Sequence, residues 1–134
     1  MMKQVIKMRI SDIQPSQFYL SSKKIKDILK WFDPHDLSCF QPVYIKQLDH
    51  HLIFTDGHTR AWVAYTYGLT HIPAIYDEDK EDWQFYQRCV DECIHQGIYC
   101  ISDLKSRILL SRDYEKYWIQ WCEEEASKIR NKDI

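Results

Sequence analysis

The chain has 134 residues and a formal net charge of −2, with 45% hydrophobic and 14% aromatic residues. This length and apolar content predict a packed core and exclude a disordered protein, and the nearly neutral charge gives no general bias toward nucleic acid or an anionic membrane. The five cysteines lack CxxC spacing, and the sequence has no signal peptide or long apolar span. We therefore expect free thiols in a cytoplasmic protein that has no membrane partner.

Residues 1–78 predict the element order β-α-β-β-α-β. Four segments have the apolar patterns of strands, and the second and third of them are joined as a hairpin. These segments are 3–10, 41–48, 51–55 and 71–77. Pro73 lies in the last segment and suggests an edge strand or a strand start, because proline cannot donate to a sheet ladder.

Two helices are predicted between these strands. In residues 21–32, apolar side chains recur at helical spacing behind a capping serine, either Ser21 or Ser22. The second helix opens at Gly57 and stops near Gly68, since glycine readily takes the left-handed conformation that ends a helix. Residues 1–78 are therefore expected to form an α+β domain with a small mixed sheet.

The rest of the chain has the pattern of helices. Apolar stripes cover 81–97, 102–110 and 112–129, and Ser102 is expected to cap the second of these. Since apolar stripes need a surface to cover, we expect residues 79–134 to form a C-terminal helical extension packed on the first domain. The sequence leaves open whether this extension covers a pocket or forms an interface with a protein partner or a second copy.

A strand passes into a helix at Asp56-Gly57-His58-Thr59-Arg60. A glycine there lets a ligand approach the backbone, and the unpaired N–H groups of the first helical turn attract an anion. Arg60 can bind a phosphate with two parallel hydrogen bonds, and His58 can donate to the same group. Asp56 can hold Mg²⁺ or accept a proton from an attacking hydroxyl. The motif therefore predicts a phosphate site that includes Thr59.

A purely structural role fits the spacing of the same residues equally well. Asp56 is an ordinary residue type for a helix N-cap, and Arg60 can form an ion pair on the surface. A motif of five residues is too short to separate the two interpretations, so spacing alone leaves both open.

Residues 40–76, FQPVYIKQLDHHLIFTDGHTRAWVAYTYGLTHIPAIY, resemble the core of the ParB/sulfiredoxin superfamily. That core joins a Gln-Pro-Ile/Val strand, a hairpin, a glycine-centred phosphate motif with arginine, an alanine-rich helix and a Gly…Ile-Pro-Val strand. The matching residues are Gln41, Pro42, Val43, Gly57, Arg60, Gly68, Ile72, Pro73, Ala74 and Ile75. The resemblance extends over residues 3–77 and implies a ParB/sulfiredoxin-like fold.

The branches of this superfamily differ from the chain at the motif. In ParB proteins a Gly-Glu-Arg-Arg motif binds the phosphates of CTP; Gly57 and Arg60 match its ends, whereas His58 and Thr59 depart from it. The 134 residues are too few to hold the helix-turn-helix and dimer-clamp domains of partition proteins as well. Chromosome partitioning by this chain alone is therefore not expected. In sulfiredoxins the nucleophilic cysteine stands where this chain has His58, so sulfinic acid reduction is not expected either.

The Asp-Gly-His-x-Arg form is most similar to that of the free serine kinases, which transfer a phosphoryl group from ADP or ATP to serine. This similarity implies that Asp56 lies near metal or substrate, with His58 and Arg60 on phosphates. Those kinases also use an N-terminal glutamate as a base, and here no glutamate precedes Glu78. The acids that precede Asp56 are Asp12, Asp27, Asp33, Asp36 and Asp49.

We therefore expect a ParB-like protein that binds a nucleotide or another phosphate-bearing ligand. The resemblance implies ATP, ADP or CTP with Mg²⁺, bound by residues 56–60 with Gln41 and Pro42 lining the site. If the chain is an enzyme, it is a nucleotide-dependent phosphotransferase in which Asp56 and His58 are catalytic and Asp56 also binds the metal.

The alternative is a ParB-like module that binds DNA or a protein without catalysis. Residues 1–31 carry seven Lys/Arg against two Asp, and the helix at 21–30 presents much of this charge. The net charge of the whole chain does not favour DNA. Binding to phosphate backbones weakens steeply as salt rises, which separates this alternative from a small-molecule site.

A zinc site at Cys89, Cys93, His95 and Cys100 is not expected. Cys89 and Cys93 lie one helical turn apart, but the spacing of the four residues fits no standard zinc pattern. Free cysteine is a common buried residue, and Cys93 lies on an apolar stripe, so a core position is the simpler interpretation.

Overall fold

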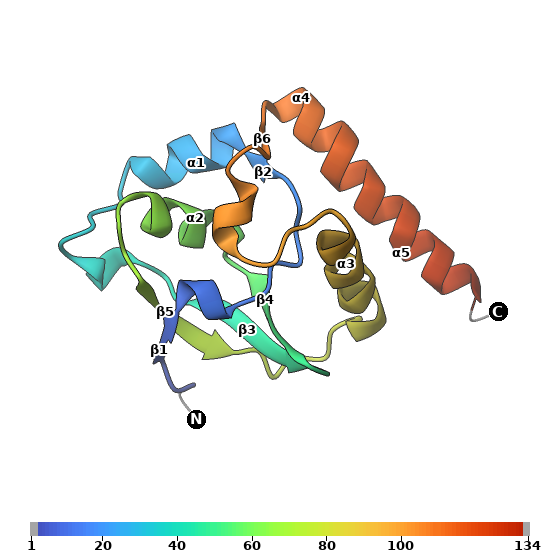
Figure 1. Cartoon of the computed structure of the whole chain (residues 1–134), viewed down its shortest axis with the longest axis horizontal. Helices are drawn as coiled ribbons and strands as arrows, with labels where there is room; N and C mark the ends of the chain where they lie inside the picture. Colours follow the sequence, from blue (N-terminus) through green and yellow to red (C-terminus); the bar gives the residue numbers. More distant parts are fainter. Residues whose placement is uncertain (1–2, 133–134) are drawn as a thin grey trace.

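A four-stranded mixed sheet underlies the fold (Figure 1). Its strands are β1 (Ile6–Arg9), β3 (Val43–Leu48), β4 (His51–Asp56) and β5 (His71–Tyr76). They lie in the order β1-β5-β3-β4, with β1–β5 and β3–β4 antiparallel and β3–β5 parallel. The structure is a computed structural model and describes residues 3–132.

Helices and short turns accompany the sheet. The helices are α1 (Ser22–Leu29), α2 (His58–Thr66), α3 (Trp83–His95) and a C-terminal helix made of α4 (Ser111–Tyr114), the π-helical turn η4 (Glu115–Ile119) and α5 (Gln120–Lys132). The short elements are the 3₁₀ turns η1 (Ile10–Asp12), η2 (Leu37–Cys39) and η3 (Ile101–Leu104), and the parallel pair β2 (Leu20–Ser21) and β6 (Ile108–Leu109). In Figure 1, α1 and α2 lie side by side, and α5 runs along α3. The chain is an α+β protein, as the sequence predicts.

The six predicted elements are present in the predicted order as β1, α1, β3, β4, α2 and β5, and the two-residue strand β2, which the sequence analysis does not predict, lies before α1. Local signals explain why these elements begin where they do. Ser21 caps α1, because its Oγ accepts a hydrogen bond from the N–H of Lys24 at 3.3 Å. Asp49 takes a positive φ of 52° in the tight turn between β3 and β4, a conformation that aspartate tolerates better than most residues.

One buried cluster contains residues from both sides of position 78. Val43 and Phe54 of the sheet and Trp62 of α2 belong to it together with Cys93 of α3 and Trp118 of the C-terminal helix. The helices after β5 therefore share the core of the first part of the chain. Residues 1–2 and 133–134, at the ends of the predicted domain and extension, lie outside the described residues.

The prediction of a helix at residues 102–110 is wrong. Ile101 and Leu104 are fully buried in the short turn η3, and Cys100 occupies its N-cap position in place of Ser102. The chain then becomes extended, because the carbonyl of Arg107 accepts a hydrogen bond from Leu20 N at 2.9 Å and β6 pairs with β2. The apolar spacing of residues 102–110 does not reveal this pairing, because β2 lies far away in the sequence.

The edge position suggested by Pro73 is also wrong, since β5 lies between β1 and β3. Pro73 is tolerated there because of its register. Ile10 N donates to Thr70 O at 2.9 Å, so Pro73, opposite Lys7, falls in a non-hydrogen-bonded pair of the antiparallel ladder. On the other side of β5, pairing with β3 begins only at Ala74. The missing N–H of proline therefore breaks no ladder bond.

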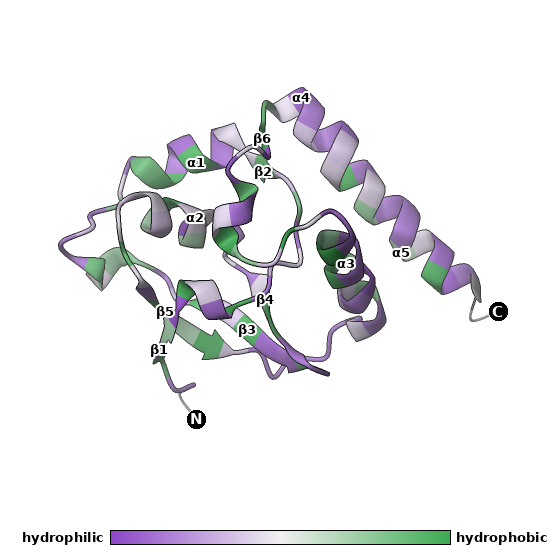
Figure 2. Ribbon diagram, viewed as in Figure 1, coloured by the Kyte–Doolittle hydropathy of each residue, from purple (hydrophilic) through white to green (hydrophobic). Residues whose placement is uncertain are grey.

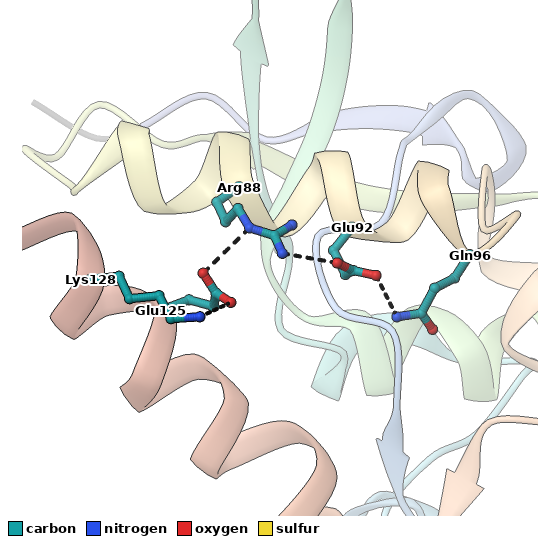
Figure 3. Close-up of polar contacts among 5 residues, drawn as sticks. All are labelled: Arg88, Glu92, Gln96, Glu125 and Lys128. Carbon is teal, nitrogen blue, oxygen red and sulfur yellow. Dashed lines mark hydrogen bonds and ion pairs between the residues drawn. The ribbon is translucent and has the colours of Figure 1, made fainter.

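The C-terminal helix is held against α3 by a polar network (Figure 3). Arg88 on α3 bonds Glu92 at 3.0 Å and reaches Glu125 on α5 at 3.4 Å, and its guanidinium lies 5.1 Å from the centre of the Trp121 ring. Lys128 pairs with Glu125 at 3.3 Å. Figure 2 shows that hydrophilic residues predominate along α5, so this network supplements a narrow apolar contact. Among residues 3–132, no helix has the length and apolar composition needed to cross a bilayer.

Replacing Arg88 by alanine is expected to lower the free energy of unfolding by about 1–2 kcal/mol, because Glu92 and Glu125 lose a charge-assisted partner at a partly buried site. Urea unfolding followed by circular dichroism measures this loss. Lys23→Ala is the matched control, since Lys23 pairs with Asp27 through side chains that are largely exposed to solvent. That control is expected to change stability by less than about 0.5 kcal/mol, and equal losses in both variants would contradict the prediction.

Candidate functional site

Gly57 makes the turn between β4 and α2. It is the N-cap residue of α2 and has φ 103° and ψ 18°, a conformation that L side chains rarely adopt. A Cβ built at Gly57 would lie 2.5 Å from Cγ1 of Val43 and 2.9 Å from the guanidinium of Arg60. Glycine is therefore required here both by the backbone conformation and by the close approach of β3.

The first turn of α2 has free backbone donors. Ala61 N donates to Gly57 O at 2.9 Å, which is the first hydrogen bond of the helix, and no side chain caps the helix start. Within the described range, the N–H groups of His58, Thr59 and Arg60 make no hydrogen bond. These groups and the positive end of the helix dipole together favour an anion at this turn.

His58 is buried, with 6% of its surface exposed, and it is held in one tautomer. Its Nε2 accepts a hydrogen bond from the backbone N–H of Ser16 at 2.9 Å, so that nitrogen carries no proton. Burial, and then the charge of Arg60, lower the pKa of His58 to about 3, so the ring is neutral at physiological pH. The proton of the neutral ring therefore sits on Nδ1, which has no partner among residues 3–132.

Arg60 connects α2 to the segment that leads into β3. Its Nε donates to Gln41 O at 3.1 Å, and its Nη2 donates to Pro42 O at 3.2 Å and lies 3.6 Å from Oδ2 of Asp56. The Gln-Pro and Gly-x-x-Arg motifs of the sequence thus meet through a guanidinium and two backbone carbonyls. Gln41 also lines a cavity of about 380 Å³ on which Arg60 borders.

A larger cavity, of about 430 Å³, opens over the turn at Asp56–Arg60. Five different segments surround it: the loop after η1, α1, the end of β4 with the start of α2, α3, and η4. The lining residues are Ser16, Gln17, Lys24, Asp27, Ile28, Thr55, Asp56, Gly57, His58, Thr59, Arg60, Phe85, Tyr86, Cys89 and Trp118. The structure therefore brings the five residues of the motif to one cavity, whereas Gln41 and Pro42 contact it only through Arg60.

The helices after residue 78 contribute residues that the sequence analysis missed. Tyr86 of α3 donates from its hydroxyl to the carbonyl of Thr55 at 3.2 Å, directly before the motif. Burial raises the pKa of Tyr86 to about 12, so the hydroxyl keeps its proton for this hydrogen bond. The contact joins residues 31 positions apart, and no spacing pattern in the sequence could have indicated it.

The acidic residues of the cavity differ in exposure and in their partners. The Asp56 side chain is 66% exposed, so its carboxylate is accessible to a cation as well as to Arg60. Of the aspartates that precede Asp56, Asp27 lines the same cavity. Hydrogen bonds from Lys23 and then Lys30 lower the pKa of Asp27, which makes it a weak proton acceptor.

The carboxylates of Asp77, Asp79 and Glu81 form a separate group in which the ligand oxygens lie within 4.8 Å of one another. Asp77 is buried and already accepts hydrogen bonds from Thr55 Oγ1 at 2.9 Å and from Asp79 N at 3.0 Å. These bonds give Asp77 a structural role at the end of β5.

The cysteines are free thiols in the structure, as expected. Cys89 and Cys93 are buried in the core, and burial raises the pKa of Cys93 to about 12. The thiol of Cys93 therefore keeps its proton at neutral pH, which fits a residue of the apolar core. Within the described residues, the four Cys and His residues considered for zinc do not gather into a metal-binding group.

No family model matches the chain, and no curated protein matches it. Among solved structures, the protein Atu1540 from Agrobacterium tumefaciens is similar in shape, with a TM-score of 0.46 and 14% sequence identity. The match covers 75% of this chain and 61% of the length of that protein.

Proposed function

We propose that the chain binds a nucleotide or another small phosphate-bearing ligand at residues 56–60, as its resemblance to ParB/sulfiredoxin-like domains implies. One observation carries the proposal. The free N–H groups at the start of α2 border the same cavity as the buried, neutral His58, whose Nδ1–H has no partner among the described residues. Donors that lack acceptors in a partly enclosed cavity are suited to an anion that supplies oxygen atoms.

The charged residues of the cavity have separate roles in this proposal. Lys24 of α1 lines the cavity and adds positive charge, while its Nζ lies 3.5 Å from the hydroxyl of Tyr114. Arg60 holds the turn in place through Gln41 and Pro42, and its remaining N–H groups are available to a phosphate. Asp56 would hold Mg²⁺ together with phosphate oxygens, since Mg²⁺ typically uses one or two carboxylates and the substrate phosphates.

His58 acts in this proposal as a hydrogen-bond donor that positions the phosphate. A general base needs an accessible lone pair, and the lone pair of Nε2 is occupied by the N–H of Ser16. If the protein transfers a phosphoryl group, catalysis therefore comes mainly from positioning and charge stabilisation by the turn and Mg²⁺. If the protein is a kinase, we therefore propose Asp56 as its catalytic carboxylate.

DNA binding through α1 has less support. Lys23 of α1 and Lys30, its C-cap residue, form ion pairs with Asp27 at 3.2 and 3.3 Å. This pairing removes part of the positive charge that the sequence places on the helix. A complex with DNA would depend steeply on salt, whereas a nucleotide in the cavity would be less affected.

Thermal unfolding with ATP, ADP, CTP and GTP, each with and without Mg²⁺, tests the proposal. A ligand at about 100 times its Kd stabilises the native state by about 2.7 kcal/mol, which raises the midpoint by several degrees. We expect such a rise with at least one nucleotide, and the part of it that depends on Mg²⁺ should disappear in Asp56→Asn. That substitution is suitable because the Asp56 side chain is largely exposed.

Arg60→Ala completes this experiment. Its midpoint without ligand is expected to drop, because the substitution removes two hydrogen bonds to Gln41 and Pro42. The ligand-induced shift is therefore compared with the unliganded midpoint of the same variant, and it should be smaller than in the wild type. An unchanged midpoint of the wild type with every nucleotide at millimolar concentration would reject a nucleotide as the ligand and leave only phosphate-bearing ligands of another kind.

A further inference from the structure

The cavity over residues 56–60 has a polar side and an aromatic side. The polar side is the start of α2, and the aromatic side consists of Phe85 and Tyr86 of α3 with Trp118 of η4. A phosphate needs only the polar side. The aromatic residues come from the helices after residue 78, and they give the cavity an apolar side that a ligand with a second, apolar part could contact.

A hydrogen bond ties the aromatic side to the strand that leads into the turn. The hydroxyl of Tyr86 is bonded to Thr55 O, and Thr55 lies two residues before Gly57. Consecutive Cα atoms are about 3.8 Å apart, so Thr55 and Gly57 are separated by at most about 8 Å. The Tyr86 hydroxyl is therefore bonded to a residue that lies nearer to the turn than the length of a nucleotide. Phe85 packs edge-on against Tyr86, with ring centres 6.2 Å apart and an angle of 68° between the rings.

The C-terminal helix closes this side of the cavity. Trp118 lies in the π-helical turn η4 and is packed edge-on against Phe18 at 4.9 Å and stacked on Trp121 at 5.8 Å. These contacts leave Trp118 only 8% exposed, so it forms a fixed end of the cavity. Phe85 lines the cavity and is only partly buried, whereas Trp118 is almost fully buried, so we take Phe85 as the residue for stacking with a ligand.

We propose that the ligand carries a planar aromatic base that stacks on Phe85 while its phosphates occupy the turn at residues 57–60. This inference rests on the proposed function and names the ligand class as a nucleotide, in preference to a sugar phosphate or a free phosphate. Stacking of a base on an aromatic side chain contributes about a factor of ten in affinity. A sugar phosphate has no planar aromatic ring and would gain less from Phe85 than a base does.

Isothermal titration calorimetry with ADP, pyrophosphate and ribose 5-phosphate tests this assignment. We expect the wild-type protein to bind ADP about ten times more tightly than either of the other two. Phe85→Leu keeps an apolar side chain of similar size against the core and removes the ring. It is expected to bring the affinity for ADP down to that for pyrophosphate and to leave pyrophosphate binding unchanged.

Tyr99→Leu is the matched control, because Tyr99 is 59% exposed and does not line the cavity. It is expected to bind all three ligands as the wild type does. Phe85→Met provides a second removal of the ring if the leucine variant unfolds during the titration. Thermal unfolding of each variant without ligand confirms that the compared proteins are folded.

The outcomes separate the two proposals. Equal affinities of the wild type for ADP and pyrophosphate would reject the base site and leave the phosphate site standing. A Phe85→Leu variant that loses ADP and pyrophosphate binding to the same extent would reject it too, because Phe85 would then act on the fold of the turn. Absence of binding by ADP, pyrophosphate and ribose 5-phosphate alike would reject the proposed function itself, and the base site with it.

Discussion

Gly57→Ala is expected to lower the free energy of unfolding by about 3 kcal/mol or more. Two costs combine in this variant. A non-glycine residue at φ 103° costs about 1–3 kcal/mol, and a Cβ placed 2.5 Å from Cγ1 of Val43 forces the start of α2 away from β3. Because the same movement displaces the first-turn N–H groups, the proposed nucleotide binding should be lost as well. Urea unfolding and calorimetry with ADP measure the two effects.

Gly68→Ala is the control that separates the two costs. Gly68 also has a positive φ, 88°, but a Cβ built there meets nothing within 4 Å. This variant should therefore lose only the conformational cost, about 1 kcal/mol, and should bind ligand like the wild type. Similar losses in Gly57→Ala and Gly68→Ala would show that the approach of Val43 does not restrict residue 57.

The free energy of unfolding of the wild type is expected to drop by about 2 kcal/mol between pH 7 and pH 5 through His58 alone. The pKa of His58 is about 3 in the folded protein, against an ordinary value of 6.5 in the unfolded chain. Between these two values the unfolded state binds a proton that the folded state excludes. Stability therefore rises with pH in this window at about 1.4 kcal/mol per pH unit, and the contribution is lost as the pH falls.

His58→Gln tests the assignment of this pH dependence. Glutamine does not titrate, and its amide oxygen can accept the N–H of Ser16 that Nε2 accepts in the wild type. Urea unfolding of both proteins at pH 7, 6 and 5 gives the difference in slope. The stability difference between wild type and variant should change by about 2 kcal/mol over this range. Parallel curves would mean that His58 is accessible to protons in the folded state.

Features that depend on neighbouring residues in the chain were predictable from the sequence. The apolar spacing of residues 21–32 and the capping serine predicted α1, and the structure confirms the cap at Ser21. Gly57 was predicted at a strand-to-helix turn, and it forms the N-cap of α2. Such predictions succeed where no distant segment pairs with the same residues, because helix periodicity and capping are properties of a few consecutive residues. At 102–110 the pairing of β6 with β2 overrides the local helical pattern.

The sequence by itself determined the α+β class, the order of the first elements and the collection of motif residues at one turn. The tertiary structure alone decided what surrounds that turn: the pairing of β6 with β2, the contact of Tyr86 with Thr55, and the hydrogen bond from Ser16 N that fixes the tautomer of His58. These contacts join residues 31 to 88 positions apart. Local periodicity reveals which face of an element is apolar, but the partner of that face is selected by packing across the whole chain.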